Sequence, residues 1–124
     1  EIDFLLDTFP FTGGTTTNHA MWMGVPTLTL SGDTLLHRQG AGIMARAGLH
    51  AWIASSKDDF VERAKRLAAD PAALDLLRRQ LRATLESTGE AEARHGTGMV
   101  GKALRTMWRR WCAGEAAQSF EVAA

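Results

Sequence analysis

The chain has 124 residues, enough for one domain that buries roughly two-thirds of its unfolded surface. Its 14 Lys and Arg balance 14 Asp and Glu, so it lacks the basic field that attracts nucleic acid or anionic lipid. The single cysteine, Cys112, excludes an internal disulfide and is typical of a reducing cytoplasm. No apolar run reaches the roughly 18 residues of a membrane span. From the charge balance and the lack of such a run, neither nucleic acid nor a membrane is an expected partner.

The first half of the chain predicts three units in which a strand is followed by a helix. Apolar runs rich in strand formers predict strands at Ile2–Leu6, Pro26–Ser31 and Ala51–Ala54. Each is followed by a predicted helix: Thr16–Met23, Leu36–Ala47, and a third after the capping sequence Ser56–Asp59. Gly24 and Gly48 are expected to end the first two helices by adopting a left-handed backbone conformation. On the third, one side carries Phe60, Val61, Ala64, Leu67 and Ala68.

Two further helices are predicted in the second half. Asp70-Pro71 is a cap with proline at the first helical position, and it precedes a stripe formed by Leu74, Leu77, Leu81 and Leu85. A last helix carries Val100, Leu104, Met107, Trp108 and Trp111 at helical spacing, although Gly96, Gly98 and Gly101 weaken its start. Trp108 and Trp111 are therefore expected in a core or an interface, with Arg109 and Arg110 facing water. The prediction is an α/β fold in one domain over residues 1–124, a partial Rossmann-like domain with about three parallel strands, flanking helices and a long C-terminal helix.

A polar loop, FPFTGGTTTNH over residues 9–19, lies where the first strand hands over to the first helix. Ligands of parallel α/β sheets bind at the carboxyl ends of the strands. If Gly13 and Gly14 allow a tight turn, the amides of Thr15, Thr16 and Thr17 face outward from a helix N-terminus, where phosphate oxygens are favoured. The alternative is that Thr15 or Thr16 only caps the helix.

Other polar residues offer weaker signals. Asp7, at the end of the first strand, is expected to fix the loop by accepting backbone amides. Arg38 lies near the same edge, where it either approaches a phosphate or pairs with Asp33. The remaining candidates, namely His37, His50, His95 and Cys112, show neither metal-ligand spacing nor a nucleophile with a neighbouring base, so no metal is expected and no catalytic residue is assigned.

Three motifs in order carry a resemblance to a known family. They are the glycine-threonine loop, the W-x-G-x-P turn at Trp22–Pro26 and the G-D-T-L-x-x-R stretch at Gly32–Arg38, with MWRRWCAG downstream. This pattern resembles the C-terminal part of the O-linked N-acetylglucosamine transferase catalytic region, in the bacterial TPR-containing and SPINDLY-like branch. The likeness is strongest over residues 7–49 and weakest over residues 89–101. It implies a GT-B architecture of two Rossmann domains, a UDP-N-acetylglucosamine donor, no metal, and transfer to Ser or Thr of a protein acceptor.

The resemblance implies a diphosphate-binding loop at Gly14, Thr15 and Thr16, with Thr17 beside them. Better-known members carry His where this chain has Gly14, and an Asp that contacts ribose where it has His19. An imidazole still donates to or accepts from a hydroxyl, so His19 is either a ribose contact or a surface residue. The candidate donor-binding residues are therefore Gly14, Thr15, Thr16, Thr17, His19 and Arg38.

By the resemblance, the three strands would be the last three of a donor-binding domain, and the chain would be a piece of a longer enzyme, inactive in isolation. The alternative is a self-associating αβ interaction module without nucleotide binding; an epimerase with a similar sheet is disfavoured by the MWRRWCAG ending. Without a partner strand on its outer side, Ile2–Leu6 exposes unpaired backbone groups beside apolar side chains. Two copies are therefore expected to form a homodimer by antiparallel pairing of this strand.

Overall fold

The computed structural model describes residues 2–122, apart from the side chains of residues 90–93. The elements in chain order are β1 (Leu5–Leu6), α1 (Thr15–Trp22), β2 (Thr27–Leu30), α2 (Leu35–Arg46), a 3₁₀ helix (His50–Trp52), β3 (Ile53–Ala54), α3 (Lys57–Ala68) and α4 (Pro71–Cys112). Contacts divide the chain into two compact units, which we call the sheet unit (Glu1–Thr88) and the C-terminal unit (Gly89–Ala124). Helix α4 contributes residues to both.

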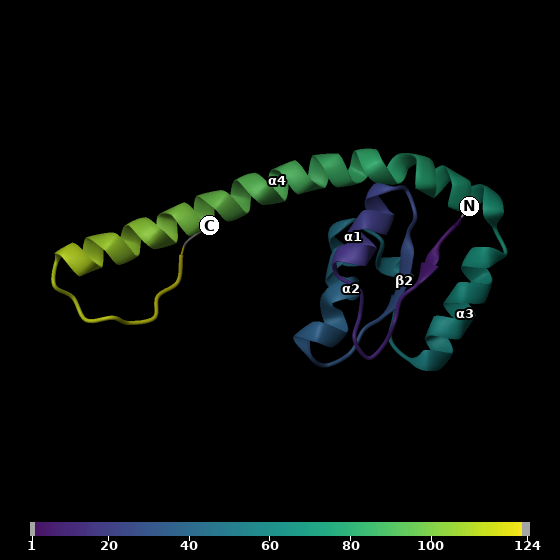
Figure 1. Cartoon of the computed structure of the whole chain (residues 1–124), viewed down its shortest axis with the longest axis horizontal. Coiled ribbons are helices and arrows are strands. Elements are labelled where there is room, and N and C mark those ends of the chain that lie inside the picture. Colours follow the sequence, from purple (N-terminus) through teal and green to yellow (C-terminus); the bar gives the residue numbers. More distant parts are fainter. Residues whose placement is uncertain (1, 123–124) are drawn as a thin grey trace. The chain divides into compact units, whose positions relative to one another are not determined.

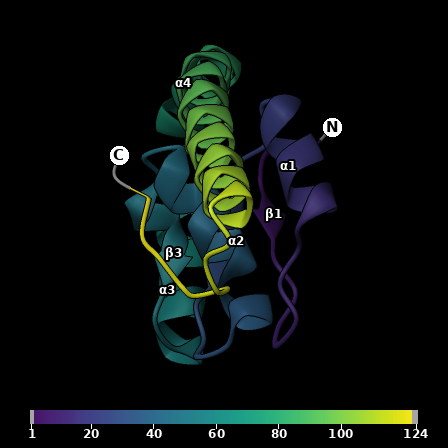
Figure 2. The same cartoon turned by 90° about the vertical axis from the view of Figure 1, so that its left-hand side faces the viewer.

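The sheet is parallel, as predicted, with strand order β1-β2-β3. Leu5 pairs with Thr27 and Leu6 with Leu28, while Thr29 pairs with Ile53 and Leu30 with Ala54. Helices α1 and α2 lie on one side of β2 and α3 lies on the other (Figure 1). Figure 2, turned by 90°, separates β1 and β3, the two outer strands. The carboxyl ends of β1 and β2 therefore meet at the edge where α1 and α2 begin.

One apolar core holds the sheet unit together. It joins both faces of the sheet to the helices and contains Met21, Leu28, Ile43, Met44, Trp52, Phe60, Leu74 and Leu81. The predicted leucine stripe is confirmed, because Leu74 and Leu81 are buried and Leu77 and Leu85 pack partly buried against the core. On α3, Phe60 is buried as expected, whereas Val61 is 49% exposed and does not belong to the apolar face.

The local stop and start signals are also confirmed. Gly24 and Gly48 adopt φ values of 75° and 73° at the ends of α1 and α2. The Ser56 hydroxyl caps α3 by accepting the Asp59 N–H, and the Asp70 carboxylate accepts the Ala73 N–H at the start of α4. The Arg63 guanidinium, 2.7 Å from the Asp59 carboxylate, and the Ser55 N–H hold the pKa of Asp59 below its ordinary value of 3.8. The Asp59 carboxylate is therefore ionised at neutral pH.

The first and third strands are shorter than predicted. Of the expected Ile2–Leu6, only Leu5–Leu6 is a strand; before it, the Asp3 carboxylate pairs with the Arg78 guanidinium of α4 at 2.7 Å. Of the expected Ala51–Ala54, the first half is the 3₁₀ helix, in which the Trp52 N–H donates to the Leu49 carbonyl. This turn buries the Trp52 ring in the core, where the Phe4 ring meets it edge-on at 5.8 Å.

The two helices predicted in the second half are one helix, α4. The glycines at 89, 96, 98 and 101 each reduce helix stability by roughly 1 kcal/mol relative to alanine, but no proline lies between Pro71 and Cys112 to remove a backbone donor. Glycine alone therefore does not end the helix. No helix among residues 2–122 combines the length and apolar character needed to cross a lipid bilayer.

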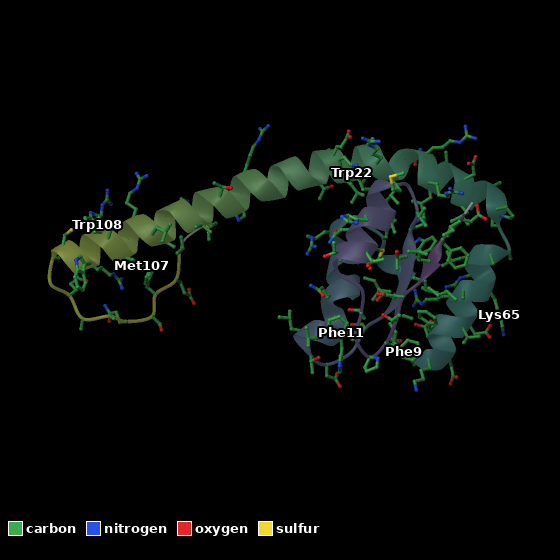
Figure 3. All side chains as sticks on the ribbon, in the orientation of Figure 1. Phe9, Phe11, Trp22, Lys65, Met107 and Trp108 are labelled. Carbon is green, nitrogen blue, oxygen red and sulfur yellow. The ribbon has the colours of Figure 1, made fainter. Side chains whose placement is uncertain are left out.

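The end of α4 and the chain beyond it form a small cluster within the C-terminal unit. The Arg110 guanidinium stacks 4.7 Å from the centroid of the Phe120 ring and lies 3.8 Å from the Glu115 carboxylate. Trp108 and Trp111, expected in a core or an interface, are 66% and 76% exposed. Neither is therefore a core residue of this unit, although Trp111 lines a shallow cavity together with Ala116 and Phe120 from the segment after α4. Figure 3 shows Trp108 near the end of α4.

The outer strand β1 is the edge at which a dimer is expected to form. Among the described strands, β1 pairs only with β2, and Leu6 on it is 56% exposed. Because the free edge retains unpaired backbone groups, we expect the chain to sediment at micromolar concentration as a dimer of the 13.5 kDa protomer. Placing a charge at the edge with Leu6→Lys should yield the monomer. A wild-type chain that sediments as a monomer would contradict the prediction.

Candidate functional site

The loop between β1 and α1 is anchored by the Asp7 carboxylate. Its Oδ1 accepts the Gly13 N–H at 2.8 Å and the Thr8 N–H at 3.0 Å, and its Oδ2 accepts the hydroxyl of Thr29 at 2.8 Å. Thr29 is fully buried on β2, so the carboxylate connects the ends of two neighbouring strands to the loop. The predicted role of Asp7 is confirmed, and its partner Thr29 is an addition that the sequence did not reveal.

A second anchor joins the loop to α2. Thr12 is fully buried; its hydroxyl donates to the Leu36 carbonyl at 2.9 Å and accepts the Gly40 N–H at 3.1 Å. Gly40 allows the loop to approach α2, since a Cβ built there would collide with Asp7 Oδ2 and lie 2.6 Å from Thr29 Oγ1. The loop is thus held by buried hydrogen bonds on both sides, which fixes the position at which α1 begins.

Helix α1 begins directly after the two glycines, with Gly14 at the N-cap position. No side chain caps this helix end, in contrast to the Thr34 hydroxyl at the start of α2. The first N–H groups of an α-helix have no partner within the helix, so those of Thr15, Thr16 and Thr17 lie at an uncapped positive end. The interpretation that Thr15 or Thr16 serves as the cap is therefore wrong.

The three threonines differ in exposure. Thr15 and Thr16 are exposed, whereas Thr17 is only 2% exposed. The Thr17 hydroxyl lies under Gly13, where a Cβ would collide with it. Only Thr15 and Thr16 therefore present hydroxyls to solvent beside the helix end, and Thr17 offers at most its backbone N–H.

The remaining sequence candidates lie on the two helices that start at this edge. His19 is exposed on α1, and Arg38 is exposed on α2, where it makes no ion pair with Asp33 or with any other residue that the structure describes. Sequence reasoning missed Gln39: a Cβ on Gly14 would lie within 3.2 Å of three side-chain atoms of Gln39. The sequence does not mark Gln39 as a candidate; its proximity to Gly14 is seen only in the contact between α1 and α2.

A cavity of about 340 Å³ opens at the same edge of the sheet. It is lined by Phe9, Pro10, Leu30, Ser31, Gly32, His37 and Lys57. The Lys57 ammonium lies 5.7 Å from the centroid of the Phe9 ring. In Figure 3, Phe9 and Phe11 lie at this end of the sheet unit and Trp22, from the last turn of α1, lies at the opposite end. Within the described part of the chain, no group of three or more His, Cys, Asp or Glu side chains is placed to hold a metal ion.

Comparisons with known proteins agree on one family. The sequence pattern of glycosyl transferase family 41 matches residues 2–94. The chain is 38% identical over 115 residues to the probable UDP-N-acetylglucosamine–peptide N-acetylglucosaminyltransferase SPINDLY of Oryza sativa subsp. japonica, and 29% identical over 121 residues to the probable enzyme SEC of Arabidopsis thaliana. These alignments cover 93% and 97% of the chain but 12% of each relative's length.

The fold comparison gives the same result. A mutant O-GlcNAc transferase of Thermobaculum terrenum superposes with a TM-score of 0.79 at 34% sequence identity, over 94% of this chain and 22% of that one. The resemblance seen in the glycine-threonine loop and the two following motifs is thereby confirmed. With more than half of its residues matched by the family pattern, the chain belongs to glycosyl transferase family 41.

Proposed function

We propose that this chain forms the diphosphate-binding part of the donor site of a protein O-glycosyltransferase that uses UDP-N-acetylglucosamine. The observation that carries the proposal is the loop at Gly13–Gly14, anchored by Asp7 and Thr12, which leaves the N-terminus of α1 uncapped beside two exposed threonine hydroxyls. Support comes from the relatives, which are described as UDP-N-acetylglucosamine–peptide transferases and an O-GlcNAc transferase.

The chemistry of the helix end suits a diphosphate. Orphan N–H groups and the helix dipole stabilise anionic oxygens, and the hydroxyls of Thr15 and Thr16 add neutral donors. In a sugar transfer from UDP-N-acetylglucosamine, the bond from the anomeric carbon to the diphosphate breaks and negative charge develops on the leaving oxygen. Donors fixed beforehand by the Asp7 and Thr12 anchors stabilise that charge without reorganising.

The other proposed contacts to the donor nucleotide are inferred from where each residue lies on α1 or α2. Arg38 is exposed on α2 at the same edge of the sheet and supplies the one guanidinium proposed for the phosphates. His19 is exposed on α1 and is proposed as the ribose contact. Thr17 contributes through its backbone N–H, because its side chain is buried.

The acceptor, a Ser or Thr hydroxyl of a protein, is proposed to be placed by parts of the enzyme that this chain does not contain, since the chain spans 12% of the length of its curated relatives. Transfer requires the hydroxyl to be held about 3–3.5 Å from the anomeric carbon. The 124-residue chain is therefore proposed to bind the donor nucleotide weakly and to transfer no sugar by itself.

Substituting Thr15 by proline tests whether the backbone N–H of residue 15 binds the diphosphate. At the first helical position the missing N–H of proline removes no helical hydrogen bond, so Thr15→Pro deletes one proposed phosphate donor; it also disfavours the ψ of −83° at the preceding Gly14. We expect about a 10-fold weaker affinity for UDP, the effect of losing one hydrogen bond to a charged group. Thr15→Val, which removes only the hydroxyl, should cause a smaller loss.

Leu35→Pro is the control for proline at the first position of a helix, because the exposed Leu35 is not a proposed contact and Thr34 before it is already extended. It should leave the UDP affinity unchanged, as measured by titration followed by NMR. Equal UDP affinity of Thr15→Pro and the wild-type chain would show that the start of α1 does not hold the diphosphate.

A further inference from the structure

The side chain of Gln39 occupies the space that a side chain at position 14 would take. A Cβ built on Gly14 would lie 3.0 Å from Gln39 Oε1, 3.1 Å from Cδ and 3.2 Å from Nε2. Gln39 comes from the second turn of α2, and its amide is thus brought from a different helix to the N-cap of α1. The absence of a side chain on Gly14 makes this approach possible.

The Gln39 amide is available to a ligand. The residue is exposed, and its side chain takes part in no hydrogen bond with the residues that the structure describes. A primary amide carries two N–H donors and one acceptor oxygen, and rotation about its last bond exchanges them at little cost. The same side chain can therefore turn its oxygen toward the positive end of α1 or its NH₂ group toward an anion bound there.

We propose that Gln39 is a donor-binding residue whose side-chain NH₂ group donates a hydrogen bond to the diphosphate at the start of α1, in the space that Gly14 leaves open. The inference rests on the proposed function, because it needs a diphosphate at that helix end. It adds a contact from α2 to a site otherwise formed by the loop and α1. Gly14 and Gln39 then act as a pair, since any side chain at position 14 displaces the amide.

The side-chain NH₂ resonances of glutamine offer a direct readout in the unmodified chain. On titration with UDP, the Gln39 NH₂ signals should shift together with the backbone amides of Thr15 and Thr16. Gln80, exposed on α4, provides the matched control in the same spectrum, and its NH₂ signals should not move. This measurement needs no variant and is independent of any effect of substitution on folding.

Substitutions at position 39 measure how much the Gln39 side chain contributes to UDP affinity. Gln39→Leu keeps the bulk but removes both donors, and should weaken UDP binding about 10-fold; Gln39→Glu places a negative charge beside the anion and should weaken it further. Gln80→Leu should bind UDP as the wild-type chain does. Gly14→Ala should weaken binding in the wild-type chain but have little further effect in Gln39→Ala, where no amide remains to be displaced.

The outcomes separate the two proposals. If the wild-type chain shows no shift at the start of α1 with UDP, the proposed function fails and the role of Gln39 fails with it. If Thr15 and Thr16 respond to UDP while the Gln39 NH₂ signals stay in place, the proposed function stands and the role of Gln39 is refuted. Unchanged UDP affinity in a folded Gln39→Leu chain would refute it equally.

Discussion

Gly40→Ala is expected to lower the free energy of unfolding by about 3 kcal/mol, the sum of overpacking and of damage to a hydrogen bond with a charged partner. A Cβ at this position collides with Asp7 Oδ2 and lies 2.6 Å from Thr29 Oγ1, neither of which is the free end of a flexible side chain. Thr29 is fully buried on β2, and Asp7 is held by three donors. The collision must therefore displace α2 or break the anchor of the loop.

Gly42→Ala is the matched control in the same helix. A Cβ there meets only Arg46 Nη1, at an ordinary contact distance of 3.7 Å. Since alanine favours a helix over glycine by roughly 1 kcal/mol, this variant should be as stable as the wild-type chain or more stable. Chemical denaturation of both variants measures the difference. Equal free energies of unfolding for Gly40→Ala and Gly42→Ala would contradict the close approach of α2 to Asp7 and Thr29.

Asp7→Ala is expected to cost about 2 to 3 kcal/mol of stability and to abolish the fixed geometry of the loop. It leaves the Gly13 N–H and the buried Thr29 hydroxyl without their acceptor. Because the loop sets where α1 begins, UDP affinity should fall along with stability, although Asp7 itself does not touch the diphosphate. Both effects can be measured on one preparation by denaturation and by UDP titration.

Asp7→Asn should restore much of the lost stability. Its amide oxygen still accepts the Gly13 N–H, and the Thr29 hydroxyl can turn to accept from the new NH₂ group. Asp33→Ala serves as the control, since Asp33 is an exposed aspartate that follows β2 and makes no hydrogen bond with a described residue. Wild-type stability and UDP affinity in Asp7→Ala would contradict the anchoring role.

Features that depend on a few neighbouring residues were predicted well from the sequence. The stops at Gly24 and Gly48 and the caps at Ser56 and Asp70 are set by local backbone geometry, so residue type alone indicates them. Asp7 belongs to this group, because one of its roles is to accept amides within the loop that follows it. The parallel strand order followed from the alternation of strands and helices.

Features that depend on contacts between distant segments were missed. Thr29, Gly40 and Gln39 act on the loop across separations of more than 20 residues, and nothing in their immediate neighbours marks them. The two glycines within α2 were a partial signal, since a glycine inside a helix often has a packing reason, but only Gly40 and not Gly42 marks a close approach. The prediction of two helices where the structure has α4 failed for another reason. The low helix propensity of glycine at positions 96, 98 and 101 costs only about 1 kcal/mol per residue, which is not enough by itself to end a helix.

A residue-resolved titration with UDP tests the central claim most directly. In the ¹⁵N-labelled chain, the backbone amides of Gly14, Thr15, Thr16 and Thr17 should shift first and most, with that of His19 following. Affinity in the millimolar range is expected, because other parts of the donor site are proposed to lie outside this chain. Shifts confined to the C-terminal unit around Trp108 and Trp111, or no shift at saturating UDP, would contradict the assignment of this loop to the diphosphate.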